Sequence, residues 1–229
     1  MAAEPPDRPA EAVRSLEVRW IFPGQIQASV AGWFGRFPAE TETREDTYLL
    51  DPPLRGLSVK VRDGRALEVK AYRGSPGIIQ VAGRARGSLE SWQKWSFPFS
   101  PLSPLSPLSP LSPLSPGSGD PPAWRQVHKR RRISRFPPAS RIIPATAAGP
   151  DQQPRCKVEL TDVHIGGQAW WTLGFEATGP ADLLRGELEA TAALVFAQAM
   201  PGGTEPGPDE STSYAEWLGQ WMGGSDAVS

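Results

Sequence analysis

The chain has 229 residues and a formal net charge of −1, so no overall electrostatic field favours nucleic acid or an anionic membrane. Its 26 Pro and 23 Gly indicate loops within a chain that is long enough to bury one substantial core. No apolar run approaches the roughly 20 residues of a membrane span, and the start lacks the pattern of a secretory signal. We therefore expect a cytoplasmic protein without a membrane partner.

The single cysteine, Cys156, excludes an internal disulfide and a cysteine-based zinc cluster. It fits a reducing compartment. It precedes an expected strand and has no histidine close by, so we expect a buried, inert thiol rather than a nucleophile.

The first part of the chain alternates between tail, strand and helix. Residues 1–14 are rich in Pro and polar residues and are expected to form a disordered tail. Alternating residues predict a strand over 16–22, and apolar residues spaced by three and four predict a short helix over 25–37. A further strand is expected over 45–50, where Asp51-Pro52-Pro53 ends it.

Asp63-Gly64 lies between two alternating runs and predicts a tight hairpin over 57–74, since Asp-Gly supplies the positive φ values of such a turn. One face of each run is apolar and the other is charged, with Lys60 and Arg62 on the first run and Glu68 and Lys70 on the second. A short strand over 78–82 and a longer one over 89–97 are expected to follow.

Pro-Leu-Ser repeats five times over 101–115, within a stretch 98–123 that we expect to be a disordered loop. The loop interrupts a single domain that spans 15–222, and 223–229 is expected to be a tail. A repeat-expanded surface loop is the favoured interpretation, and a ligand for a proline-binding partner is the alternative.

The second part of the chain begins with a basic strand over 124–136, in which apolar residues between the Lys and Arg indicate ordered structure rather than a nuclear-import or nucleic-acid patch. Strands over 157–163 and 169–177 flank a Gly-Gly turn. Helices are predicted over 183–200 and 211–222, and their apolar stripes are interpreted as core contacts.

Nearly every predicted strand carries ionisable residues at positions i and i+2, so that they share one face. An open sheet packed on helices would give this pattern, and so would a closed barrel, in which the charged faces meet in one lumen. A lumen lined by cations needs a polyanion, and its acids could hold a divalent ion. The residues are Glu17 and Arg19, Lys60 and Arg62, Glu68 and Lys70, Glu90 and Lys94, Lys129 and Arg131, Lys157 and Glu159, and Glu176.

The order of the motifs resembles the CYTH family, the triphosphate tunnel metalloenzymes. That family opens with Glu-x-Glu-x-Lys, where this chain has Ser15, Glu17 and Arg19, so one acid is missing. Six further segments resemble family strands in the same order: Asp46-Thr47-Tyr48, Lys60-Val61-Arg62, Leu67 to Lys70, Arg86 to Glu90, Val127 to Arg131, and Val158 to Glu176.

The resemblance implies an α+β, mainly antiparallel β fold: an eight-stranded tunnel with a charged lumen and flanking helices. It implies a small-molecule triphosphate or polyphosphate as substrate, Mg or Mn as cofactor, and no nucleic acid except a 5′-triphosphate end. By the same resemblance Arg19, Lys60, Arg62, Lys70, Lys94, Lys129 and Arg131 would hold phosphates, and Glu17, Glu159 and Glu176 would hold the metal.

Three functions follow as hypotheses. The first is a metal-dependent triphosphatase. The second, motivated by Ser15, is a degenerate tunnel that binds a phosphorylated ligand without turning it over. The third is a β-rich interaction protein that recruits partners through its Pro-Leu-Ser loop and basic strand.

Overall fold

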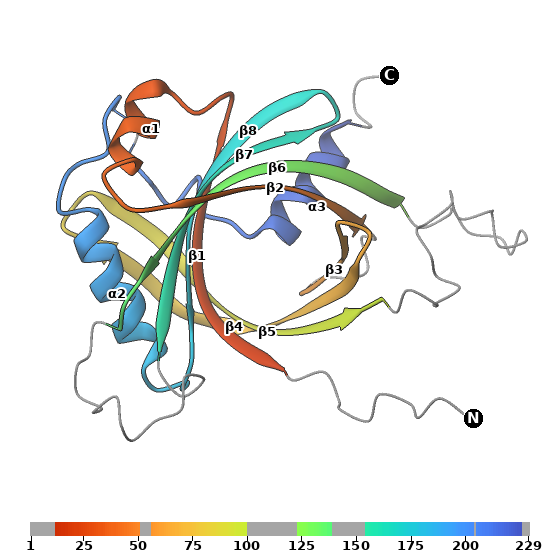
Figure 1. The fold of residues 1–229 in the computed structure, drawn as a ribbon, viewed down its shortest axis with the longest axis horizontal. Coiled ribbons are helices and arrows are strands. Elements are labelled where there is room, and N and C mark those ends of the chain that lie inside the picture. The colour runs from red at the N-terminus through yellow and green to blue at the C-terminus, as the bar shows by residue number, and fades with distance from the viewer. Residues whose placement is uncertain (1–11, 51–55, 100–122, 139–153, 204, 226–229) are drawn as a thin grey trace, which may run out of the picture.

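Eight antiparallel strands close into a barrel in the order β1-β5-β4-β3-β2-β6-β7-β8 (Figure 1). The structure, a computed structural model, describes residues 12–50, 56–99, 123–138, 154–203 and 205–225. The α+β, mainly antiparallel β fold with an eight-stranded barrel is confirmed. The strands are β1 Val13–Pro23, β2 Glu40–Leu50, β3 Leu57–Arg62, β4 Ala66–Val81, β5 Ala85–Pro98, β6 Ala123–Phe136, β7 Arg155–Ile165 and β8 Gln168–Thr178.

The hairpin between β3 and β4 turns where the sequence predicts it. Asp63 and Gly64 have φ values of 47° and 64°, and Arg65 N donates to Arg62 O at 2.8 Å. The same chemistry recurs between β4 and β5, where Ala82 and Gly83 have φ values of 50° and 65°. Ala82 does not have the side chain that usually favours this conformation, so sequence alone did not indicate the second turn.

The largest departures from the expected strands are in β4 and β2. The predicted strand over 78–82 is not separate, because β4 continues through it, with register shifts between Tyr72 and Gly77. Gly74 and Gly77, with φ values of 123° and 107°, take up this irregularity. The strand β2 begins at Glu40 rather than at residue 45, because its first residues pair with β6.

The expected termini and loop are only partly described. The strand β1 begins at Val13, which pairs with Lys94 of β5, so the expected tail 1–14 is two residues too long. The expected tail 223–229 begins too early, because the last helix runs to Ser225. Residues 1–11, the Pro-Leu-Ser repeats and residues 226–229 lie outside the described residues.

Two helices, α1 (Ala28–Phe34) and α2 (Leu184–Val195), contribute to a core on the outer surface of the barrel. Both are shorter than predicted. Trp20, Phe175 and Phe196 meet there, with ring centroids 5.9–6.1 Å apart. Cys156 is buried in the same core, as expected, and burial raises the pKa of its thiol to about 12. In the described part of the chain, no helix has the length and apolarity that crossing a membrane requires.

The third helix, α3 (Tyr214–Ser225), packs across one end of the lumen. Its Trp217 and Leu218 are buried against inward-facing apolar residues of the strands, among them Ile21, Val127 and Val163. The lumen is therefore apolar at the end that α3 covers, and charged beyond it.

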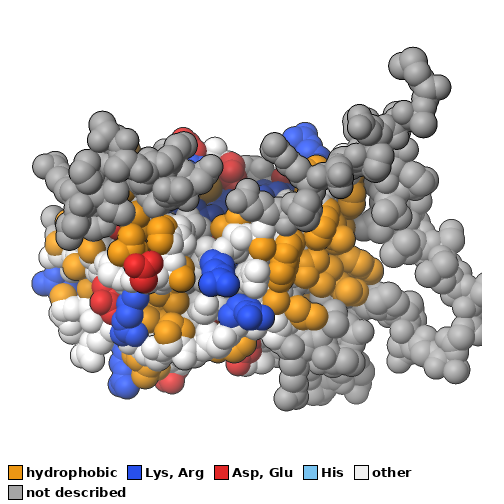
Figure 2. Space-filling view, turned by 90° about the horizontal axis from the view of Figure 1, so that it is seen from below, with side chains coloured by type: hydrophobic (Ala, Val, Ile, Leu, Met, Phe, Trp, Pro, Cys, Tyr) orange, Lys and Arg blue, Asp and Glu red, His pale blue; other side chains and the backbone are white. Residues whose placement is uncertain are grey.

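The segment before α3 fills the gap where β1 and β5 separate. Arg86 N donates to Pro206 O at 2.8 Å, and Ile21 N donates to Glu210 O at 2.9 Å, so both strand edges are partnered. The outer side of the barrel is partly apolar and exposed: Leu57 and Phe97 are 39% and 44% exposed. Figure 2 shows hydrophobic side chains gathered on one part of the lower face.

Candidate functional site: a charged tunnel

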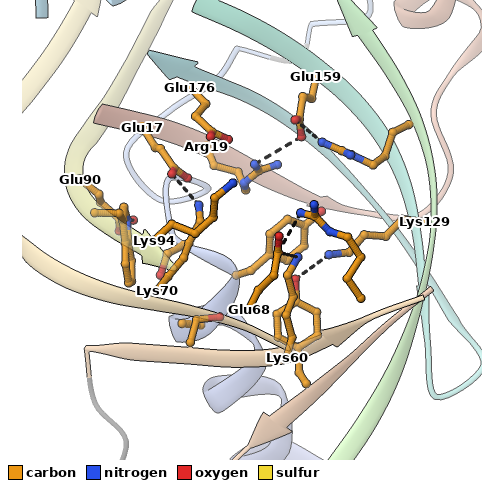
Figure 3. Close-up of a pocket in the computed structure, with 18 of the residues that line it drawn as sticks. Glu17, Arg19, Lys60, Glu68, Lys70, Glu90, Lys94, Lys129, Glu159 and Glu176 are labelled. Atoms are coloured by element: carbon orange, nitrogen blue, oxygen red, sulfur yellow. Dashed lines mark hydrogen bonds and ion pairs between the residues drawn. The ribbon is translucent and has the colours of Figure 1, made fainter. Parts of the chain in front are cut away.

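The alternation of each strand directs its charged residues into the barrel, where they line one cavity of about 90 Å³ (Figure 3). A water molecule needs only about 10–15 Å³ of such space, so the cavity has room for several waters or for a phosphate-sized anion. Every strand contributes at least one charged side chain. The nine cations are Arg19, Arg44, Lys60, Arg62, Lys70, Lys94, Lys129, Arg131 and Lys157, and the five acids are Glu17, Glu68, Glu90, Glu159 and Glu176.

All seven residues predicted to hold phosphate and all three predicted to hold a metal line this cavity. Sequence reasoning missed Arg44, because β2 was expected to begin after it, and Trp92 and Tyr214, because aromatic residues carried no charge signal. Tyr48 lines the cavity as well, and Asp46 lies buried beside it; both were quoted only as part of a motif.

Asp46 is the centre of the innermost cluster, and its side chain has no exposed surface. Its Oδ2 atom accepts from Lys129 at 2.8 Å, Lys60 at 3.0 Å and Arg44 at 3.2 Å. Burial alone would raise the pKa of Asp46, but these three cations together hold it far below its usual range. Asp46 is therefore ionised, and it ties β2 to β3 and β6.

Lys129 and Lys60 have their pKa values lowered, chiefly because burial disfavours the charged ammonium. The pKa of Lys60 falls to about 8, while Asp46 opposes the shift in both lysines. Lys129 also donates to Tyr48 Oη at 2.7 Å and lies 4.0 Å from the centre of the Tyr214 ring. These contacts fix Lys129 at the bottom of the cavity.

A second cluster lies nearer the solvent, on β1, β4, β7 and β8. Lys70 Nζ lies 2.6 Å from Glu17 Oε1. Lys157 Nζ lies 3.1 Å from Glu159 Oε1 and 2.9 Å from Glu176 Oε2. Burial would raise the pKa of Glu176, but Lys157 and then Lys70 lower it to about 2. Glu159 and Glu176, whose pKa values are both lowered, are therefore ionised, and all three glutamates are paired with lysines.

Two residues of β5 stand apart from these pairs. Lys94 lines the cavity and has no carboxylate oxygen within 4 Å among the described residues, and burial lowers its pKa. Glu90 accepts a hydrogen bond from Trp92 Nε1 at 2.9 Å. Burial, with a smaller contribution from the Glu17 charge, raises the pKa of Glu90 to about 7. Lys94 is thus a cation available to an anionic ligand, and Glu90 changes its charge near neutral pH.

The three predicted metal ligands do not form a site that fits a divalent ion. Glu17 is paired with Lys70, Glu159 is bound by Arg131 and Lys157, and Glu176 shares Lys157. In the described part of the chain, no three His, Cys, Asp or Glu side chains are placed to hold a metal. Positive side chains already occupy the space between these carboxylates.

The fold and the tunnel define this chain as a closed antiparallel β-barrel with a charged lumen, and this bears out the CYTH-like resemblance as far as the fold is concerned. No protein-family model and no curated protein matches the sequence. The solved structures that are similar include the following two. The PH1819 protein from Pyrococcus horikoshii OT3 has a TM-score of 0.42 and 12% identity, with 90% of this chain and 99% of that chain covered. The S. pombe Pct1 RNA triphosphatase has a TM-score of 0.36 and 10% identity, with 82% of each chain covered.

Proposed function

We propose that the tunnel binds a triphosphate or polyphosphate group, carried by a small molecule or by the 5′ end of a nucleic acid. The observation that supports this most is the charge of the cavity: nine Lys and Arg side chains face five Glu, with Asp46 buried beside them, so the cations remain in excess. Like charges in a partly desolvated space repel, and a polyanion is the ligand that relieves this repulsion. The RNA triphosphatase among the similar structures is distant, so the proposal rests on the tunnel.

The cations divide into two roles. Lys129 and Lys60 hold Asp46 at the bottom and keep the barrel together. Lys94, Arg62 and Lys70 are more accessible. Lys94 has no partner among the described carboxylates, and the side chains of Arg62 and Lys70, which pair with Glu68 and Glu17, are 35% and 24% exposed. These three would contact phosphate oxygens first, through charge-assisted hydrogen bonds.

Hydrolysis with Mg or Mn, which the family resemblance implies, is the second candidate. The specific observation in its favour is that Glu17, Glu159 and Glu176 all face the same cavity. A divalent ion would require them to exchange their lysine and arginine partners, so we place binding ahead of turnover. The third hypothesis, an interaction protein, makes no use of the cavity.

Thermal melting with sodium tripolyphosphate tests the proposal, because a ligand that binds the folded state raises the melting temperature. We expect a concentration-dependent rise with tripolyphosphate and a smaller one with inorganic phosphate, because fewer cations are engaged. Released phosphate, measured with added Mg²⁺ or Mn²⁺, separates hydrolysis from binding. An unchanged melting temperature at millimolar tripolyphosphate would contradict the proposal and favour the interaction protein.

A further inference from the structure

Lys157 lies between the carboxylates of Glu159 and Glu176, at the position that a metal ion shared by the two would occupy. Its Nζ lies 3.1 Å from Glu159 Oε1 and 2.9 Å from Glu176 Oε2, and the two glutamates come from neighbouring strands. Their side chains are 6% and 12% exposed, so the surrounding protein holds both in place. Figure 3 shows Glu159 and Glu176 facing the cavity from the same wall.

Arg19 fills the adjoining space in the same way. In the register of the sheet, Gly174 of β8 lies between Arg19 of β1 and Glu159 of β7. A Cβ atom added at Gly174 would lie 2.8 Å from the Arg19 guanidinium carbon, so the guanidinium occupies the volume that a side chain at this position would take. Arg19 is held there by a hydrogen bond to Thr172 at 3.1 Å and by the Tyr214 ring at 4.6 Å.

These contacts leave no room for a divalent ion between the glutamates. Mg²⁺ requires oxygen ligands at about 2.0–2.1 Å in near-octahedral geometry. At Glu159 the approach is blocked by Lys157, Arg131 and the nearby Arg19, each of which would also repel a second cation.

We propose that Lys157 takes the place of the divalent ion that the family resemblance implies, so that the phosphate ligand binds to this tunnel without metal. The identity of the ligand in this inference rests on the proposed function. The statement that Lys157 excludes a divalent ion from the two glutamates does not depend on it. An ammonium group bridges Glu159 and Glu176 with one positive charge instead of two. The remaining lysines and arginines, which outnumber the acids, then supply the charge that phosphate oxygens need.

The role of Lys157 can be tested with Mn²⁺ alone, followed by the loss of the free-ion signal in electron paramagnetic resonance. We expect the wild-type chain to take up no Mn²⁺ at about 100 µM free ion. Lys157→Gln and Lys157→Ser remove the one cation that both glutamates share, and we expect these variants to bind Mn²⁺ at least about tenfold more tightly than the wild type. Two variants are used, and circular dichroism establishes which are folded.

Lys94→Gln is the matched control, because it removes the same charge from the same cavity without freeing a paired carboxylate. We expect Lys94→Gln to bind Mn²⁺ as weakly as the wild type. Wild-type uptake equal to that of the Lys157 variants would overturn the inference. So would folded Lys157 variants that bind no more Mn²⁺ than Lys94→Gln does.

The inference that the ligand binds without metal is tested by measuring the melting temperature of the wild type with tripolyphosphate, first in EDTA and then with Mg²⁺. We expect the same rise in melting temperature in both. A rise that appears only with Mg²⁺ overturns the inference and leaves the proposed function standing. No rise in either condition overturns the proposed function and the inference that the ligand binds without metal, and the Mn²⁺ experiment then decides the role of Lys157 by itself.

Discussion

Replacing Lys94 by Met should separate ligand binding from stability. Lys94 is half-buried in the cavity and has no carboxylate partner within 4 Å among the described residues. One hydrogen bond to a charged group contributes about 1.5–3 kcal/mol, and 1.4 kcal/mol is a factor of ten in affinity. The Kd for tripolyphosphate should therefore rise about 10- to 100-fold.

Lys129→Met should show the opposite pattern. Lys129 is bound to Asp46 at 2.8 Å and Tyr48 at 2.7 Å, and its side chain is 2% exposed. Breaking a buried ion pair costs about 3–5 kcal/mol, and each kcal/mol lowers the melting temperature by about 2–4 °C in a chain of this size. The melting temperature should therefore fall by about 6–20 °C, whereas Lys94→Met should leave it unchanged or raise it, because an unpaired, partly desolvated cation is removed.

Isothermal titration calorimetry with tripolyphosphate and thermal melting measure the two quantities on the same samples. Arg14→Met is the control, since Arg14 is exposed and does not line the cavity. The reasoning is refuted if Lys94→Met leaves the Kd within twofold of the wild type, or if it lowers the melting temperature as much as Lys129→Met does.

Three further predictions concern charge and packing. Asp46→Asn leaves three buried cations without their shared anion, so unfolding in urea should show a loss of about 3–5 kcal/mol; a loss below about 1 kcal/mol would contradict the central role of Asp46. Because the pKa of Glu90 is raised to about 7, its negative charge is lost as the pH falls through 7. Sulfate, whose own charge stays constant, should bind several-fold more tightly at pH 6 than at pH 8, and Glu90→Gln should reduce this difference. Gly87→Ala places a Cβ 2.8 Å from both Ser211 Oγ and Val18 Cγ2 and should cost about 1–3 kcal/mol, while Gly186→Ala meets no atom within 4 Å in α2 and should add about 0.5–1 kcal/mol; equal melting temperatures of the two variants would show that the barrel accommodates the added methyl.

Period-two alternation was sufficient to place the charged residues on the correct face. Glu17, Lys60 and Glu176 were assigned to a common lumen from single strands, because successive side chains of a strand point to opposite faces. Which charges meet could not be predicted this way. The bridge formed by Lys157 depends on the pairing register of β7 with β8, which is a property of two strands and their turn rather than of either sequence alone.

A local sequence pattern also could not predict where the strands and helices begin and end. The sequence over 40–44, Glu-Thr-Glu-Thr-Arg, has no apolar alternation, and it becomes strand only because β6 offers it a hydrogen-bonding edge. The apolar stripe of α3 indicated a core contact, but a stripe does not say which surface it will meet. The apolar stripe of α3 packs against the inside of the barrel, and this contact depends on the tertiary structure.

Because α3 covers one end of the barrel, the cavity is closed at that end. In the part of the chain that the structure describes, a ligand would therefore enter from the opposite end, and a long phosphate chain would not be threaded through and processed from its middle. Only an end of the phosphate chain would then reach Lys129 at the bottom of the cavity, so the barrel would bind its ligand by the terminal phosphates.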